Sequence, residues 1–145
     1  MVALTIPSEY GYVLGVAAVT AVYTFSIGIR VGGARKAANV PYPYPYATQE
    51  EADKDKKKYI FNCTQRAHQN SLEQLPVFLT LLLIGGLRHA EISAAAGAFY
   101  LVGRIIYVNG YCTGEPSKRT RGIFGMLGFL AVLGTTASTV YNLIR

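Results

Sequence analysis

The stretch YGYVLGVAAVTAVYTFSIGI, from Tyr10 to Ile29, holds 20 residues without a charge between Glu9 and Arg30. As a helix it would be about 30 Å long, which is the thickness of the hydrocarbon core of a bilayer. A cleaved signal peptide is the alternative, but the run is longer than a usual signal-peptide core and no basic residue precedes it. The stretch therefore predicts a membrane-spanning helix.

Three further apolar runs follow it. Ile123–Ile144 is uncharged over 22 residues, and Ile92–Gly114 is interrupted only by Arg104. Gln74–Leu87 has 14 residues and reaches spanning length only when it is extended back to Arg66. The bilayer core offers no water to the backbone N–H and C=O groups, so a spanning segment must form these hydrogen bonds within itself. Each run is therefore expected to be helical. The sequence predicts one all-α domain over residues 1–145, a four-transmembrane-helix bundle with helices at about 8–32, 62–88, 91–113 and 121–144 and a cytosolic loop at 33–58.

Composition agrees with a membrane protein and excludes other classes. Of the 145 residues, 51% are hydrophobic and only 15% are charged, whereas a small water-soluble enzyme needs a more polar surface. The net charge of +6 comes without a recognition fold, which argues against nucleic acid as a partner. The two cysteines, Cys63 and Cys112, form no ligand pattern with histidine, so no metal site is expected. Each is read as a small membrane residue, with a peroxide-reducing protein thiol as the alternative.

Positive charge is concentrated in two of the connecting segments. Eight basic residues lie from Arg30 to Arg66, and three more follow the third apolar run, which together makes 11 of the 14. The positive-inside tendency therefore places both segments in the cytosol and both chain ends on the other side. Asn62 begins a formal glycosylation acceptor that would stay unmodified there, and a glycan at Asn62 would overturn this orientation.

The first of these segments contains an alternating Pro-Tyr repeat at residues 41–46. Alternating proline favours an extended polyproline II conformation, which predicts a stiff spacer along the membrane surface. A recognition motif for a partner is the alternative, and the role of the repeat stays open. The lysines at 54–58 that follow suit the head groups of anionic membrane lipids.

Polar residues inside two predicted spans point to a functional site. Arg66, Asn70 and Glu73 recur at helical spacing, which places them on one side of their helix. An ionisable residue within a spanning segment is costly and usually functional. The alternative is a purely structural role, in which these groups only join helices, for example through a buried ion pair of Arg104 with Glu73. Excess positive charge together with tyrosine hydroxyls favours a cleft for a small anionic ligand.

Two motifs carry a resemblance to a known family. The segment FNCTQRAHQNSLE at Phe61–Glu73 contains the pattern Arg-Ala-His-x-Asn-x-x-Glu, and NGY at 109–111 is followed by GEPSKR at 114–119. Both closely resemble the MAPEG family, the membrane-associated proteins of eicosanoid and glutathione metabolism, and in particular its glutathione transferase branch. The resemblance implies a homotrimer of left-handed four-helix bundles in the endoplasmic reticulum membrane. It also implies an active site between adjacent subunits, open to the cytosol.

The resemblance further implies a glutathione site. The residues that match glutathione contacts of the family are Arg35, Lys36, Arg66, His68, Asn70, Glu73, Arg104, Tyr107 and Tyr111. The catalytic arginine of the family matches Arg119 or Arg121, and the Pro-x-x-Arg context favours Arg119. Gln74 replaces a tyrosine of the leukotriene-forming branch.

The implied function is a membrane-bound glutathione S-transferase that also acts as a glutathione peroxidase. Glutathione is the co-substrate, and lipophilic electrophiles or lipid hydroperoxides are its partners, with conjugation of the leukotriene C4 synthase kind included. The preferred electrophile and the balance of the two reactions stay open. The alternative function is a non-catalytic lipid-binding scaffold, which the family also contains. Two pairs of small residues, Gly11 with Gly15 and Gly125 with Gly128, are compatible with close helix contacts in an oligomer.

Overall fold

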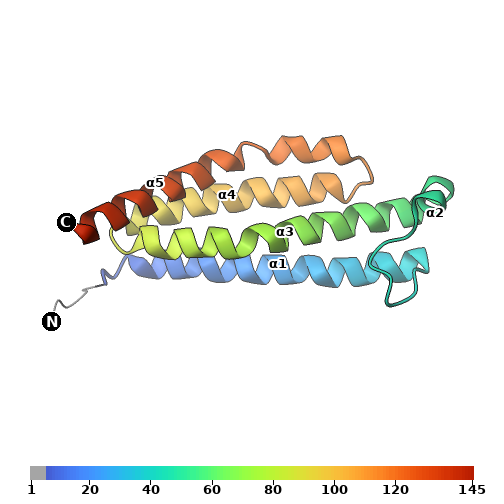
Figure 1. The fold of residues 1–145 in the computed structure, drawn as a ribbon, viewed down its shortest axis with the longest axis horizontal. Coiled ribbons are helices and arrows are strands. Elements are labelled where there is room, and N and C mark those ends of the chain that lie inside the picture. The colour runs from blue at the N-terminus through green and yellow to red at the C-terminus, as the bar shows by residue number, and fades with distance from the viewer. Residues whose placement is uncertain (1–5) are drawn as a thin grey trace.

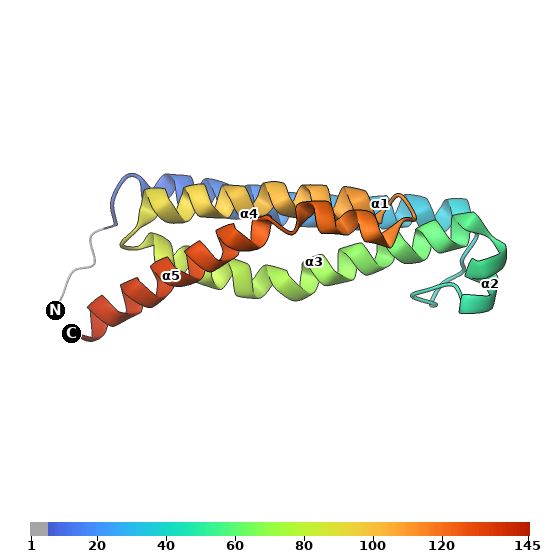
Figure 2. The ribbon, with the colours of Figure 1, turned by 90° about the horizontal axis from the view of Figure 1, so that it is seen from above.

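The computed structural model describes residues 6–145, which form only helices and the turns that connect them (Figure 1). The all-α prediction is confirmed. In chain order the elements are α1 (Tyr10–Ala38), α2 (Gln49–Lys54), α3 (Lys56–Gly86), α4 (Ala90–Tyr111), the 3-10 helix η1 (Pro116–Gly122) and α5 (Gly125–Ile144). The four long helices run lengthwise, with α1 packed on α3 and α4, and α5 packed on the same two helices (Figures 1 and 2).

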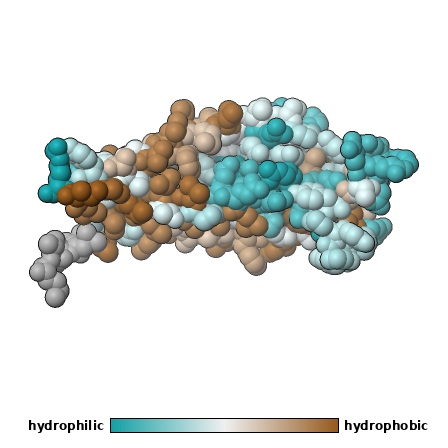
Figure 3. Space-filling model, viewed as in Figure 1, coloured by the Kyte–Doolittle hydropathy of each residue, from teal (hydrophilic) through white to brown (hydrophobic). Residues whose placement is uncertain are grey.

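The surface of the bundle identifies a membrane protein. Three helices, α1, α4 and α5, are long and apolar enough to cross a membrane. Large apolar side chains point outward from them, such as Val22, Phe25 and Leu127, which are 67%, 73% and 65% exposed. In Figure 3 the apolar surface covers the half of the molecule where α1 begins and α5 ends, and the polar surface lies toward the α2 end. Contiguous exposed apolar surface of this kind faces lipid.

The first helix is longer than predicted. It was expected to end near residue 32, but α1 continues to Ala38 and is terminated by Asn39 in the left-handed conformation, with φ of 51°. The Asn39 N–H donates to the carbonyls of Arg35 and Lys36. Basic side chains in the last turn of a helix complement its dipole, so the helix extends beyond the apolar run that predicted it.

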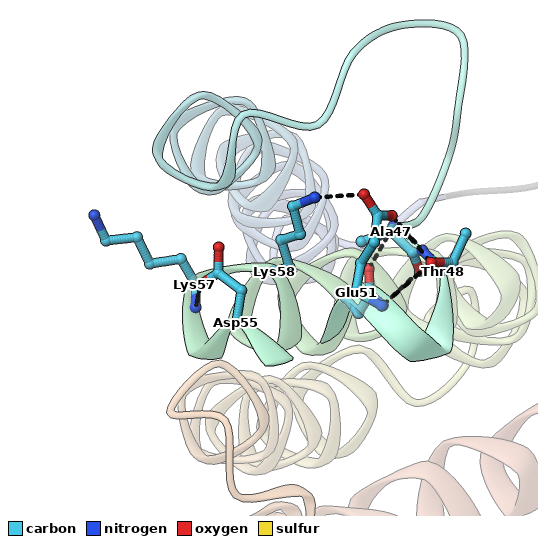
Figure 4. A network of polar contacts seen from close by, with 7 residues as sticks. Ala47, Thr48, Glu51, Asp55, Lys57 and Lys58 are labelled. Atoms are coloured by element: carbon cyan, nitrogen blue, oxygen red, sulfur yellow. Dashed lines mark hydrogen bonds and ion pairs between the residues drawn. The ribbon is translucent and has the colours of Figure 1, made fainter. Parts of the chain in front are cut away.

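The predicted loop at 33–58 is also partly helical at its other end. Thr48 and Glu51 form a capping box that starts α2, and Asp55 caps α3 by accepting from the N–H of Lys57 at 2.8 Å (Figure 4). The Lys58 ammonium donates to Glu51, and this bond is the main reason why the pKa of Glu51 falls to about 2. These caps satisfy the free N–H groups of each first turn, so helix forms in a stretch too polar to be read as a span.

The Pro-Tyr repeat forms turns instead of the predicted extended spacer. Its backbone folds over the guanidinium of Arg35, which is only 8% exposed. Arg35 donates to the carbonyl oxygens of Val40, Pro41 and Tyr44, at 3.4, 3.5 and 2.7 Å. Its guanidinium also lies over the rings of Tyr42 and Phe61, at 4.5 and 4.8 Å. The buried cation, with carbonyls around it, holds the turn closed.

Glycines bring α4 against η1 and α5. A side chain on Gly103 would lie 2.5 Å from the Cα of Gly125, and one on Gly128 would overlap the carbonyl of Ala96. Gly125 and Gly128 therefore serve packing within the chain, whereas Gly11 and Gly15 face open space. The last helix, predicted from residue 121, begins at Gly125 because η1 occupies 116–122.

Candidate functional site

The polar residues of α3 do lie together. Arg66 and Glu73 form an ion pair with 3.2 Å between Nη1 and Oε1, and their side chains are 43% and 49% exposed. At this exposure a pair is weak, because water competes for both charges. Both groups are thus available to a ligand that carries an ammonium and a carboxylate.

Arg104 joins α4 to the same side of α3. Its Nη2 donates to Asn70 Oδ1 at 3.0 Å and to Ser71 Oγ at 2.9 Å, and its guanidinium lies 4.4 Å from the centre of the Tyr107 ring. The pairing of Arg104 with Glu73, which the sequence offered as a purely structural alternative, does not form, because Glu73 pairs with Arg66. Among residues 6–145 no carboxylate lies within salt-bridge distance of Arg104. Since its acceptors in this part of the chain are neutral, the half-buried guanidinium can pair with the negative charge of an anionic ligand.

Tyr111 and Arg119 complete the cluster at its polar end. The rings of Tyr107 and Tyr111 meet edge to face at 5.9 Å, and the Arg119 guanidinium lies 5.3 Å from the centre of the Tyr111 ring. Gly110 allows this approach, since a side chain there would lie 2.5 Å from the carbonyl oxygen of Lys118. Arg121 is exposed. Of the two arginines that the sequence left open, the structure brings Arg119 to the cluster.

A cleft of about 230 Å³ opens beside Arg104, a volume near the lower end of ordinary ligand pockets. One wall is polar and comes from α3 and α4, where Tyr100 donates to Gln74 at 2.8 Å. The other wall is made by Ile123, which lies between η1 and α5, and by Met126 in the first turn of α5. A space with one charged wall and one apolar wall can hold a polar reactant against a lipophilic one.

Three predicted site residues lie outside this cluster within the protomer. Arg35 is occupied by the loop carbonyls described above, and Lys36 beside it is exposed. His68 faces α1, where a side chain on Gly28 would meet the His68 ring at 3.4 Å. It lines a separate groove that also includes Phe25. The helical turn explains the separation of His68, because it follows Arg66 by only two residues and so projects from another side of α3.

The chain matches the family model of the MAPEG family over residues 13–141. The chain belongs to the MAPEG family. Over 78 residues it is 37% identical to microsomal glutathione S-transferase 2 of Mus musculus, a stretch that covers 50% of this chain and 53% of that protein. The chain thus spans about half the length of this curated relative. The family that the two motifs predicted is confirmed, and the matched range of this MAPEG chain includes the whole cluster from Arg66 to Arg119.

Some residues of the site carry no signal in the sequence. Ser71 and Tyr100 are ordinary helix residues until the structure shows Arg104 and Gln74 bonded to them. Tyr46 belongs to the Pro-Tyr repeat, yet its hydroxyl donates to Gln69 of α3. The sequence indicates only that Gln69 shares a side of α3 with Arg66 and Glu73, because the three residues recur at helical spacing. It does not indicate that Tyr46 contacts Gln69.

Proposed function

We propose that this MAPEG chain is a membrane-embedded glutathione S-transferase. The observation that carries the proposal is the convergence of Arg104 and Arg119 with two tyrosines beside the polar side of α3, where Arg66 pairs with Glu73. Glutathione has two carboxylates, an ammonium group and a thiol. Guanidinium and phenol donors suit its carboxylates, and Glu73 suits its ammonium.

Arg119 is the residue proposed to activate the thiol. A free thiol with a pKa of about 8.5 leaves only a few per cent thiolate at neutral pH. Lowering this pKa by about two units corresponds to roughly 2.7 kcal/mol, which a charge-assisted bond to a guanidinium can supply in a partly dry cleft. Arginine keeps its proton at any physiological pH, so it stabilises the thiolate without competing for the proton.

The activated thiolate has two proposed uses. In conjugation it attacks the electrophilic carbon of a lipophilic substrate and forms a thioether, while a carbon–oxygen bond of that carbon, as in an epoxide, breaks and its oxygen leaves with the electron pair and takes up a proton. This is conjugation of the leukotriene C4 synthase kind. In peroxide reduction it attacks the terminal oxygen of a lipid hydroperoxide, and the O–O bond breaks. The lipid leaves as an alcohol and glutathione becomes a sulfenic acid, which a second glutathione converts into the disulfide and water. The apolar wall at Ile123 and Met126 suits the lipid partner of both reactions.

The arrangement in the membrane also belongs to the proposal. We infer that α3 is a fourth crossing, since it runs beside α1 and α4 along the bundle (Figures 1 and 2). The basic α2 end would then face the cytosol, in the endoplasmic reticulum membrane. In a homotrimer, Lys36 and His68 of an adjacent subunit would reach glutathione, because within one protomer they face away from the cluster. Measuring the mass of the detergent-solubilised protein tests the trimer.

The decisive experiment uses the whole protein, purified in detergent and returned to liposomes. We expect thiolate absorbance on mixing with glutathione, and turnover of an aromatic electrophile and of a fatty-acid hydroperoxide. A lipid-binding scaffold would instead bind fatty acid and show neither signal. Replacing Cys63 and Cys112 with serine serves as the control, and both activities should survive it. Loss of the peroxidase activity alone would assign that reaction to a protein thiol.

A further inference from the structure

The segment Pro41–Ala47, which we call the strap, has no part in the function proposed above. Its first half is held by Arg35, as described. Its last residue is held by Asn62 of α3, whose Oδ1 accepts from the Ala47 N–H and whose Nδ2 donates to the Ala47 carbonyl, both at 2.9 Å. Figure 4 shows the Ala47 end beside the Thr48–Glu51 cap. A chain segment tied by a buried guanidinium and by a two-way amide contact has a defined position on the surface of α3.

The strap directs Tyr46 along the polar side of α3. Its hydroxyl donates to Gln69 Oε1. Asn62 and Gln69 are seven residues apart, which puts them on the same side of the helix and about 10 Å apart along its axis. Arg66 lies between these two contact points in the sequence and on the same side. The backbone next to Tyr46 is held at Asn62 through Ala47 and the Tyr46 hydroxyl reaches Gln69, so the Tyr46 side chain lies near Arg66.

The charges around Tyr46 are those of the candidate site. Burial raises the pKa of Tyr46, the Arg66 guanidinium lowers it, and Tyr111 and Glu73 raise it. The phenol is thus protonated at neutral pH and is a permanent donor. Its present acceptor, a neutral amide, is a weaker partner for that donor than a carboxylate would be.

We propose that Tyr46 is a glutathione-contacting residue, held by the strap so that its hydroxyl donates to the α-carboxylate of the γ-glutamyl end. The inference rests on the proposed function. The γ-glutamyl end carries an ammonium beside that carboxylate. Glu73 takes the ammonium, and Arg66 and Tyr46 take the carboxylate from two sides. The hydroxyl exchanges Gln69 for the ligand, and the exposed Gln69 side chain then bonds to water instead.

The first test compares two tyrosines of the same repeat. Tyr46→Phe should raise the KM for glutathione about tenfold and change kcat less than about twofold, because a ground-state contact is lost while the thiol environment is kept. Tyr44→Phe is the matched control. The Tyr44 ring is 61% exposed and only its backbone carbonyl contacts Arg35, so the KM should not change.

The second test locates the contact on the ligand. γ-Glutamylcysteine lacks the glycine carboxylate but keeps the γ-glutamyl end. Tyr46→Phe should therefore raise the KM for γ-glutamylcysteine by the same factor as the KM for glutathione. If the deficit disappears with γ-glutamylcysteine, the contact is to the glycine carboxylate and the assignment to the γ-glutamyl end is wrong. Asn62→Ala removes the amide contact that holds the strap, so it should also raise the KM for glutathione. Adding Tyr46→Phe to Asn62→Ala should raise this KM little further, because both changes remove the same contact.

The outcomes separate this inference from the function on which it rests. A wild-type protein that neither binds nor turns over glutathione overturns the proposed function and this inference together. An active wild-type protein whose Tyr46→Phe and Tyr44→Phe variants share its KM overturns only the role of Tyr46. Size-exclusion profiles and helicity of each variant in detergent establish that it is folded.

Discussion

Replacing Gly110 with alanine should disable the site without touching any polar group in it. Gly110 lies in α4 directly before Tyr111, where the backbone of η1 crosses it. A Cβ at this position would lie 2.5 Å from the carbonyl oxygen and 2.7 Å from the carbonyl carbon of Lys118, and 3.1 Å from the amide nitrogen of Arg119. These atoms are backbone, so no side-chain rotation relieves the overlap. The segment that carries Arg119 must move away from Tyr111.

The size of the effect follows from the size of the displacement. Ordinary contact begins at 3.4 Å, so the carbonyl of Lys118 must retreat by nearly 1 Å. A misplacement of about 1 Å in a reacting group can cost about 100-fold in rate, or roughly 2.7 kcal/mol. We expect Gly110→Ala to lower kcat for conjugation by about this factor. The KM for glutathione should change much less, because Asn70 and Arg104 stay in place.

The assay is steady-state conjugation at saturating electrophile, together with the pH dependence of glutathione thiolate absorbance. If Arg119 retreats, the pKa of the bound thiol should rise toward its value in water. Gly134→Ala is the matched control, since Gly134 is also a helical glycine but has nothing within 4 Å. Alanine favours helix over glycine at both positions, so a loss confined to Gly110→Ala cannot come from helix propensity. A folded Gly110→Ala protein with wild-type kcat would refute the reasoning.

Three further predictions concern Arg104, the pair Arg119 and Arg121, and the junction of α2 with α3. Arg104→Ala should raise the KM for glutathione at least about tenfold, measured by steady-state kinetics. The KM of Arg104→Lys should lie between those of the wild type and Arg104→Ala, because lysine keeps the charge but not the paired donors of the guanidinium. Arg119→Ala should lower the thiolate fraction at neutral pH by about 25-fold, read from thiolate absorbance, because a shift of about two units moves the thiol pKa back above pH 7. Arg121→Ala should leave the fraction unchanged, and the opposite ranking would move the thiolate contact to Arg121. The pKa of Glu51 is lowered from 4.5 to about 2, chiefly by the Lys58 bond, so this contact stabilises the α2–α3 junction above pH 4.5 and is lost as the pH falls toward 2. Proteolysis of the junction should therefore accelerate over that range in the wild type, and Glu51→Gln should remove this pH dependence.

The sequence was sufficient for the helical class and the family, and it placed Arg66, Asn70 and Glu73 on one side of α3. It succeeded there because a period of 3.6 residues fixes which side chains share a side of a helix. The NGY motif also has a structural reason for each position. Asn109 accepts from Arg30 of α1 at 2.8 Å, Gly110 admits η1, and Tyr111 lies beneath Arg119.

The pairings within the site could not be predicted in the same way. Periodicity places Arg104 and Glu73 on the facing sides of their helices but does not fix the axial offset between the helices. That offset decides that Arg104 meets Asn70 and Ser71. Arg35 was expected to contact glutathione because it matches a contact of the family, whereas its surroundings within the chain depend on how the loop returns over it. Both arrangements depend on tertiary geometry, which no local pattern contains.

In the proposed arrangement, with α3 as a fourth crossing, the depth of the polar residues explains why a site for a water-soluble peptide can lie on spanning helices. Counting back from Gly86, the 20 residues needed to cross a bilayer reach Ala67, which puts Arg66 at the boundary and Glu73 about 10 Å inside it. On α4, Tyr111 ends the helix at the same boundary and Arg104 lies about 10 Å inside. The hydrogen bond from Arg104 to Asn70 shows that the inner polar residues of α3 and α4 lie at a similar depth. A guanidinium at that depth is tolerated because it faces another helix and a cleft. In the proposed orientation, a polar reactant that enters from the cytosol would therefore meet a lipid-dissolved one at the apolar wall formed by Ile123 and Met126.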